Sequence, residues 1–342
     1  MYPYLRLYIY QPKYSPPYLK VLHCQYILIL EIQTSFFNIN YLEDKMDSIY
    51  QQAKQRKFEE KTDKSFYNIL SGFKSHQTFF DAMMQGMLPF YNSRPSVTGD
   101  TAESLTFYPY FYDSCHMTFQ ALRLLTQSMS AFSAGIRDFY PVSNQLFIQQ
   151  QVKEWLALNG KDVTVYQSEL LGLYSGLSEE LETFSYKLLA DAKGNHFRAD
   201  EIMMTDDLDV ETYNLKLLHE LNHLTHLIHH HNYFSQLYIR APLQFATEQT
   251  MQLLQEGWSI ERIARKRGVK THTIEDHIIE MIIKDYRIDV DHYISAEEIE
   301  EVRQLYHEHR YQRLKPYFER SAIDDYFKVK LGLCLMMKGV KQ

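Results

Sequence analysis

The 342-residue sequence lacks several patterns that mark well-known protein classes. It has three cysteines, Cys24, Cys115 and Cys334, which are far apart and form no CxxC pair, so the thiols indicate a reduced, intracellular protein rather than a cysteine metal site. No stretch approaches the roughly 20 apolar residues that cross a bilayer. No GxxxxGK[ST] phosphate loop is present, so nothing in the chain supplies a nucleotide-driven motor.

The chain also lacks an overall positive charge, because its formal net charge is −7. No global basic field therefore draws it onto nucleic acid, and any nucleic-acid site must come from a local cluster of Lys and Arg. Apolar residues make up 45% of the chain, which allows a sizeable core. The length is enough for about two domains.

The first 45 residues contain no Gly and no Ala, but they hold eight Tyr and four of the ten Pro. The apolar run Val21–Ile32 is broken by three polar residues and lacks the basic start and cleavage site of a signal peptide. Two interpretations stay open. Residues 1–45 are either a β-prone extension packed on the body, or sequence upstream of a true start at Met46. We favour the second, because no periodicity here indicates a stable element.

From Met46 onward the chain is typical of helices joined by short connections. Runs rich in Gln, Leu, Met, Lys and Glu recur, whereas alternating strand-like runs are scarce. The clearest helical segments are Gln51–Glu60, Ser65–Leu70, Gln77–Met87, Phe119–Phe132 and Gln145–Leu158. Pro242 is expected to mark a domain boundary, because a proline stops the preceding helix.

The five residues HELNH match the zinc-protease pattern HExxH. In a zinc site His219 and His223 would be ligands, Glu220 would be the general base, and Glu248 would be a candidate third ligand. A bare five-residue match is weak evidence. A metallopeptidase is therefore the least favoured interpretation of this chain.

The spacing within the same helix, expected from Asn214 to Tyr238, favours a simpler interpretation. An apolar stripe at i, i+4, i+7 and i+11 faces the core, formed by Leu217, Leu221, Leu224 and Ile228. A row of histidines follows the same rhythm two residues later, about 200° around the helix. We therefore expect a solvated polar face formed by His219, His223, His226 and His230.

The stretch Thr250–Lys284 has the packing pattern of a helix-turn-helix. The first helix ends at Gly257, and Ser259 is a good N-cap for a short second helix. Gly268 then occupies the left-handed turn that only glycine adopts at low cost. A third helix is expected to begin near Thr271. The residues predicted to be buried are Ile260, Ile263, Ala264, Val269, Ile274, Ile278 and Ile282.

The charge of this stretch favours contact with DNA. Between Gly257 and Ile274 five basic residues stand against one acid, Glu261. The basic residues would bind phosphates, and the start of the third helix would lie nearest the bases. The predicted DNA-binding residues are Arg262, Arg265, Lys266, Arg267, Lys270, Thr271, His272, Thr273 and His277. The alternative is a three-helix protein-docking module whose basic face is merely solvated.

The run LLQEGWSIERIARKRGVKTHTIEDHIIEMI resembles the helix-turn-helix domain found at the C-terminus of RecQ-type helicases. The resemblance extends over about 95 residues, from Phe245 to Lys338. Its most specific matches are Gly257, Ile263-Ala264, Arg267-Gly268, Thr273-Ile274-Glu275 and His277. Lys270 departs from the pattern, because the family tends to carry a small capping hydroxyl there.

A second segment, KSFYNILSGFKSHQTFFDA, resembles the opening of the YpbB-like family, whose members are encoded beside a RecQ-type helicase in some bacteria. The matching residues are Leu70, Gly72, Lys74, Ser75, Gln77, Thr78 and Asp81. A family start near Met46 agrees with the composition. The resemblance implies a cytoplasmic DNA-binding or helicase-accessory protein without its own motor. We further expect no cofactor, no membrane contact and no small-molecule substrate.

The sequence therefore predicts a mainly α protein, with an all-helical domain of unknown role over residues 46–241 and a C-terminal helix-turn-helix domain over 242–342. The favoured function is a non-enzymatic DNA-binding accessory of a RecQ-type helicase. One alternative is a helical interaction module that docks on the helicase. Another is a transcription regulator, which would need a dimer with two half-sites, although no heptad run suggests one.

Overall fold

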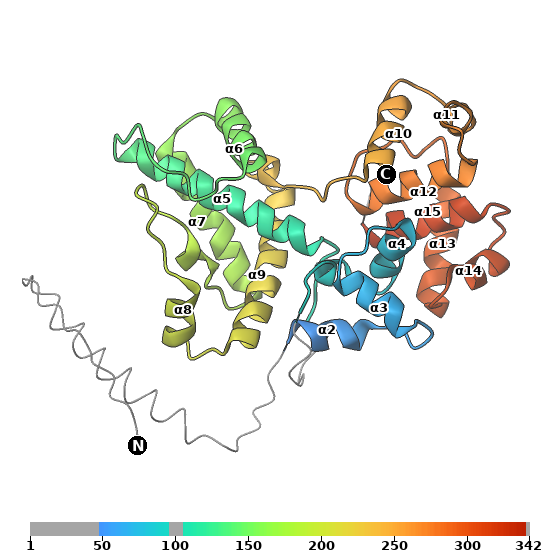
Figure 1. The fold of residues 1–342 in the computed structure, drawn as a ribbon, viewed down its shortest axis with the longest axis horizontal. Helices are drawn as coiled ribbons and strands as arrows, with labels where there is room; N and C mark the ends of the chain where they lie inside the picture. The colour runs from blue at the N-terminus through green and yellow to red at the C-terminus, as the bar shows by residue number, and fades with distance from the viewer. Residues whose placement is uncertain (1–47, 96–104, 340–342) are drawn as a thin grey trace, which may run out of the picture. The chain divides into compact units, whose positions relative to one another are not determined.

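The computed structural model describes residues 48–95 and 105–339. Within these ranges the chain forms fourteen α-helices, three short 3-10 helices and no strand (Figure 1). The predicted mainly α fold is confirmed. The unusual leader 1–45 and the expected start at Met46 lie outside the described residues. No helix within the described ranges combines the length and apolar character that a membrane span requires.

Three short helices open the described chain, and each has a hydroxyl cap. The hydroxyls accept hydrogen bonds from backbone N–H groups of the first turn, which satisfies donors that a helix start otherwise leaves unpaired. A 3-10 turn, η1 (Leu88–Phe90), follows them. The helices are α2 (Ile49–Arg56), α3 (Asp63–Leu70) and α4 (His76–Met84), capped by Ser48, Thr62 and Ser75.

The middle of the chain packs around the long helices α5 (Tyr112–Ser133) and α9 (Val210–His230). Buried residues of both helices share one core, which also contains Trp155. The other elements of this region are α6 (Leu146–Asn159), α7 (Val163–Glu180), η2 (Ser185–Leu188), α8 (Ala199–Thr205) and η3 (Ser235–Leu237).

The helix expected from Asn214 to Tyr238 instead begins at Val210 and ends at His230. Tertiary contacts explain its early end. Phe234 turns back and is fully buried, with its ring stacked on Trp155 at a centroid distance of 6.3 Å. The Trp155 indole N–H also donates to the carbonyl of Tyr233 at 2.9 Å. A straight helix would carry Phe234 away from this core.

The C-terminal region contains six helices, and α12 lies at its centre. Residues of α12 contact α4, α10, α11 and α15. The helices are α10 (Phe245–Gln255), α11 (Ile260–Arg267), α12 (Thr271–Ile283), α13 (Ala296–His309), α14 (Leu314–Arg320) and α15 (Tyr326–Met337). The third helix of the predicted helix-turn-helix thus begins at Thr271, as expected.

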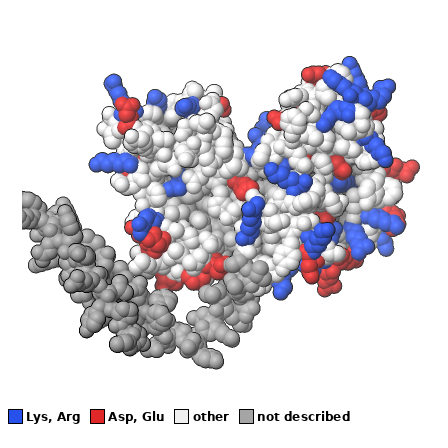
Figure 2. Space-filling model, viewed as in Figure 1, with Lys and Arg blue, Asp and Glu red and all other residues white. Residues whose placement is uncertain are grey.

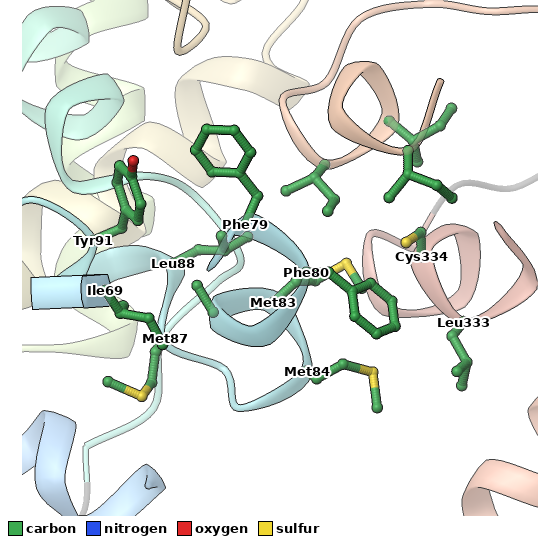
Figure 3. Close-up of a cluster of buried hydrophobic side chains, with 14 of the residues drawn as sticks. Ile69, Phe79, Phe80, Met83, Met84, Met87, Leu88, Tyr91, Leu333 and Cys334 are labelled. Atoms are coloured by element: carbon green, nitrogen blue, oxygen red, sulfur yellow. The ribbon is translucent and has the colours of Figure 1, made fainter. Parts of the chain in front are cut away.

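The hydrophobic cores do not follow the expected boundary at Pro242. The core that contains Phe80 and Met83 of α4 also contains Ile279 of α12 and Leu333 and Cys334 of α15. Figure 3 shows these α4 side chains directed toward Leu333 and Cys334. The first three helices therefore pack on the C-terminal region, although they precede it by more than one hundred residues. The division of the chain into domains at Pro242 stays a prediction.

Candidate nucleic-acid interface

The second helix of the motif, α11, is short, capped at both ends and strongly amphipathic. Ser259 accepts a hydrogen bond from the N–H of Arg262, and Gly268 ends the helix in the left-handed region with φ 65°. Ile263 and Ala264 are buried against Ile274 of α12. This packing turns the charged residues of α11 outward. Val269 departs from the expectation, because it is 37% exposed rather than packed beneath the turn.

The outward face of α11 and the turn into α12 form a cationic surface. Its members are exposed, and none forms an ion pair within the described residues. Figure 2 shows Lys and Arg gathered over this part of the molecule, at the upper right. The cationic surface consists of Arg262, Arg265, Lys266 and Lys270, with Thr271 and His272 exposed beside them.

Trp258 organises part of the cationic surface and was not identified from the sequence. The guanidinium carbon of Arg262 lies 3.6 Å from the centroid of the indole ring, and the Lys266 ammonium lies 4.4 Å from it. Such contacts hold a cation over the negative face of an aromatic ring. The sequence signal that would have found this arrangement is an aromatic residue just before the N-cap Ser259, followed by Arg262 and Lys266 one turn apart on α11.

The start of α12 offers backbone donors beside these cations. Lys270 is its N-cap and provides no side-chain hydrogen bond. The first N–H groups of a helix have no partner within the helix, and together with the helix dipole they favour a bound anion. In the family that the sequence resembles, a small capping hydroxyl tends to stand at this position. Here Lys270 places a positive charge at the start of α12 instead. Thr273 is only partly exposed.

Two of the predicted DNA-binding residues bond to neighbouring helices, the half-buried Arg267 and the buried His277. Arg267 donates to the carbonyl of Ala246 at 2.7 Å and also bonds the hydroxyl of Thr250. His277 is 2% exposed, and its Nδ1 lies 2.7 Å from the Oγ1 of Thr250. These residues fasten α10 to α11 and α12. We therefore correct their assignment from DNA contact to internal packing.

Of the predicted histidine row of α9, His230 is exposed as expected, but His219, His223 and His226 are buried or half-buried, which is a second correction. The aromatic segment Thr106–Tyr112 covers these three histidines. Tyr108 stacks on His226 with the ring centroids 3.6 Å apart, and Phe107 meets His219 edge-on at 5.2 Å. Burial lowers the pKa of both histidines to about 4. Both rings are therefore neutral at pH 7.

The HExxH residues are used for packing in this fold. The Glu220 carboxylate is fully buried and accepts hydrogen bonds from the backbone N–H groups of Phe184 and Ser185 at 3.0 and 2.9 Å. The two ring nitrogens of His223 lie 2.8 Å from Glu180 and 3.2 Å from the carbonyl of Thr106. These contacts commit the carboxylate and the second histidine of the pattern to protein partners.

Glu248, the candidate third ligand, lies exposed on α10 within the helix-turn-helix. Over the part of the chain that the structure describes, no three His, Cys, Asp or Glu side chains are grouped so that they could hold a metal ion. The structure therefore does not bring His219, His223 and Glu248 together as ligands. The zinc-protease pattern here arises from residues that serve separate packing roles.

Comparison with known proteins agrees with the geometry of the C-terminal region. A family described as a helix-turn-helix domain matches residues 246–333. Protein YpbB of Bacillus subtilis (strain 168) is 22% identical over 237 residues, and the match covers 66% of each chain. No solved structure matches. Residues 246–333, which include α10, α11 and α12, therefore form a helix-turn-helix domain.

Proposed function

We propose that this protein binds DNA through the cationic surface of α11 and the start of α12, and that it is a non-enzymatic accessory protein of a RecQ-type helicase. The observation that carries the proposal is a set of exposed cations on the helix-turn-helix that have no ion-pair partner among the described residues: Arg262, Arg265, Lys266 and Lys270. They stand together on a chain whose net charge is −7. A cationic surface confined to one motif is typical of a site for a phosphate backbone.

The cations would bind phosphates, and the exposed Thr271 and His272 would lie nearest the base edges. Binding of this kind releases counterions from DNA, so the affinity falls steeply as the salt concentration rises. Asp276 does not oppose the approach of DNA strongly, because it forms an ion pair with Lys330 at 2.7 Å. The helicase part of the proposal rests on the resemblance of residues 245–338 to the C-terminal domain of RecQ-type helicases and on the similarity to protein YpbB.

The test measures binding of the full chain to labelled single-stranded, duplex and forked DNA by fluorescence anisotropy over a range of salt. A triple variant, Arg265→Glu, Lys266→Glu and Lys270→Glu, is expected to abolish binding. The matched control reverses three exposed cations elsewhere, with Arg137→Glu, Lys153→Glu and Lys193→Glu, and therefore has the same net charge. Unchanged DNA affinity in the first variant would defeat the proposal, as would equal loss in both.

A second candidate, a protein-docking role on the helicase, is favoured by exposed apolar side chains on α6 and α7. Leu146 and Leu158 of α6 are 80% and 71% exposed, and Leu171 of α7 is 70% exposed. A fragment ending at residue 241 is a poor reagent for this question, because α2, α3 and α4 share a core with the C-terminal helices.

The docking role is better tested with the full chain. A triple variant carrying Leu146→Glu, Leu158→Glu and Leu171→Glu would be compared with the DNA-surface variant in a nuclease-treated pull-down of the purified helicase. Loss of the helicase only in the leucine variant would support docking through α6 and α7. Loss only in the DNA-surface variant would assign the contact to the helix-turn-helix, and retention in both would reject the two surfaces as docking sites.

A further inference from the structure

A second cationic feature lies away from the cationic surface, in a cavity of about 560 Å³. Its walls come from the loop between α3 and α4, the turn after η1, the start of α5 and the segment before α10. Gly72 and Lys74 line it, so the segment KSFYNILSGFKSHQTFFDA, which resembles the opening of the YpbB-like family, contributes directly. The helix-turn-helix does not explain why these residues are there.

The local structure of this segment brings two loops together. The N–H of Asn92 donates to the carbonyl of Ile69, and the N–H of Arg94 donates to the carbonyl of Leu70, both at 3.0 Å. Gly72 has φ +73°, and a Cβ placed on it would lie 2.5 Å from the Oδ1 of Asn92. Only glycine permits this close approach. The turn 91–94 is thereby fixed against the end of α3, with Lys74 and Arg94 both on the cavity wall.

The cavity carries an excess of positive charge. The side chains of Lys74 and Arg94 are exposed and form no ion pair or hydrogen bond within the described residues. Lys284 also lines the cavity, but Glu280 at 2.6 Å and the carbonyl of Pro242 at 2.8 Å already occupy its ammonium. The acid on the wall, Asp113, accepts a hydrogen bond from Asn92 at 2.9 Å. Lys74 and Arg94 therefore remain available to an anion.

Asn92 and Arg94 have left-handed backbone angles, φ 67° and 47°. Residues with a side chain rarely adopt this region, and such conformations persist only where the surrounding structure imposes them. Here the hydrogen bonds to the end of α3 impose them. The consequence is that the Arg94 side chain is presented at the cavity instead of continuing in the direction of an extended chain.

We propose that this cavity binds a phosphate monoester of a nucleotide, with Lys74 and Arg94 supplying positive charge. A phosphate monoester fits because it offers nearly two negative charges and three acceptor oxygens to separate donors. The volume exceeds that of a phosphate alone and is in the range of small-molecule sites. Phe245, exposed on the rim, offers a ring for a base to stack on.

The phosphate monoester has two possible sources, a free nucleotide or the 5′ end of a DNA strand. The experiment uses the full chain and measures binding of adenosine 5′-monophosphate, adenosine, inorganic phosphate, and one short oligonucleotide with and without a 5′-phosphate. Titration calorimetry or fluorescence anisotropy gives each affinity. Binding of the monophosphate but not of adenosine supports a free nucleotide as ligand. A preference for the phosphorylated oligonucleotide alone supports a strand end.

Variants separate this cavity from the DNA surface. Lys74→Ala and Arg94→Ala should each weaken the phosphate-dependent binding at least tenfold, whereas Lys64→Ala, an exposed lysine outside the cavity wall, should leave it unchanged. The Arg265, Lys266 and Lys270 triple variant should bind the monophosphate normally, whatever its effect on DNA.

The proposal fails if no phosphate-bearing probe binds, or if Lys74→Ala and Arg94→Ala bind as well as Lys64→Ala. It also fails if inorganic phosphate and an unrelated anion such as sulfate bind equally well, and if both bind the variants as tightly as the wild type. Such a result would mean that anions bind non-specifically to the charged surface. Failure of this proposal would leave the DNA-binding proposal intact, because the two use different residues and different probes.

Discussion

The carboxylate of Glu220 accepts a hydrogen bond from the backbone N–H of Ser185 at 2.9 Å. This bond joins the middle of α9 to the start of η2, two elements that the sequence places 35 residues apart. The acid of an apparent catalytic pattern is therefore a structural acceptor for buried backbone donors. Glu220 of the HExxH pattern, which suggested catalysis, instead stabilises the fold.

Replacement of Glu220 tests this structural role. Glu220→Ala leaves the N–H groups of Phe184 and Ser185 without their acceptor in a buried place, which costs about 1–3 kcal/mol for each unsatisfied group. Glu220→Gln keeps one acceptor oxygen and should lose much less. Urea denaturation followed by circular dichroism measures both variants. Equal stability of Glu220→Ala and the wild type would contradict the role.

Arg265 and Arg267 form a matched pair that separates surface charge from packing. Arg265→Ala should change the free energy of unfolding by less than about 0.5 kcal/mol. It should also reduce the slope of log DNA affinity against log salt concentration by about the amount that one phosphate contact contributes. Arg267→Ala should lower the stability by about 1–3 kcal/mol, because Ala246 and Thr250 lose a charged donor. Denaturation and salt titration on both variants check the distinction, and identical behaviour would refute it.

Trp258 is expected to assist DNA binding without touching phosphate. Trp258→Leu removes the ring beneath Arg262 and Lys266, a contact worth about 0.5–1 kcal/mol at an exposed position. The affinity should fall roughly two- to fivefold. The slope of affinity against salt should stay unchanged, because every cation remains. Anisotropy titrations at several salt concentrations measure both quantities, and a changed slope would argue that the indole itself meets DNA.

Gly72 and Gly86 test the close approach in the loop after α3. Both have positive φ, +73° and +63°, so alanine costs each position about 1 kcal/mol through the backbone. A Cβ at Gly86 would meet nothing within 4 Å, whereas one at Gly72 would collide with Asn92. Gly72→Ala should therefore lose a further ~1–3 kcal/mol. Thermal denaturation of the two variants provides the comparison. Equal losses of stability would show that the Asn92 side chain moves aside at little cost.

His277 should make the protein less stable in acid. Burial, with His76 and Arg267 nearby, lowers its pKa to about 4, against 6.5 for an unperturbed histidine. Between these values the unfolded chain binds more protons than the folded chain, so the free energy of unfolding falls as the pH drops from about 6.5 to 4. The loss from this residue is about 3 kcal/mol.

His277→Gln removes this titration and should flatten the pH dependence of the unfolding free energy over the same window. Its stability at pH 7.5 should be slightly lower, because glutamine bonds Thr250 less well than the imidazole does. Urea denaturation at pH 7.5, 6 and 5 checks the slope. A variant with the same slope as the wild type would show that His277 titrates normally. His116, His219, His226 and His229 have similarly lowered pKa values and contribute to the remaining slope.

Local sequence signals predicted the helix-turn-helix in detail, because its shape depends on contacts close in the chain. Ser259 caps α11 and Gly268 ends it, as expected from their residue types. The isoleucines Ile274, Ile278 and Ile282 are buried at the spacing that predicted it. The charge cluster was equally visible. What the pattern could not tell was that Arg267 turns inward, since its partners Ala246 and Thr250 lie on another helix.

The sequence by itself determined the helical class of this protein, the position and caps of the motif and the local excess of positive charge, because each follows from neighbours within a few turns. Only the tertiary structure decided which polar residues meet solvent. Whether the histidines of α9 are exposed depends on Tyr108, which comes from a segment more than one hundred residues earlier. Whether Lys74 and Arg94 line one cavity depends on how two loops pack. Burial depends on contacts between residues that are far apart in the sequence, so local periodicity does not predict it.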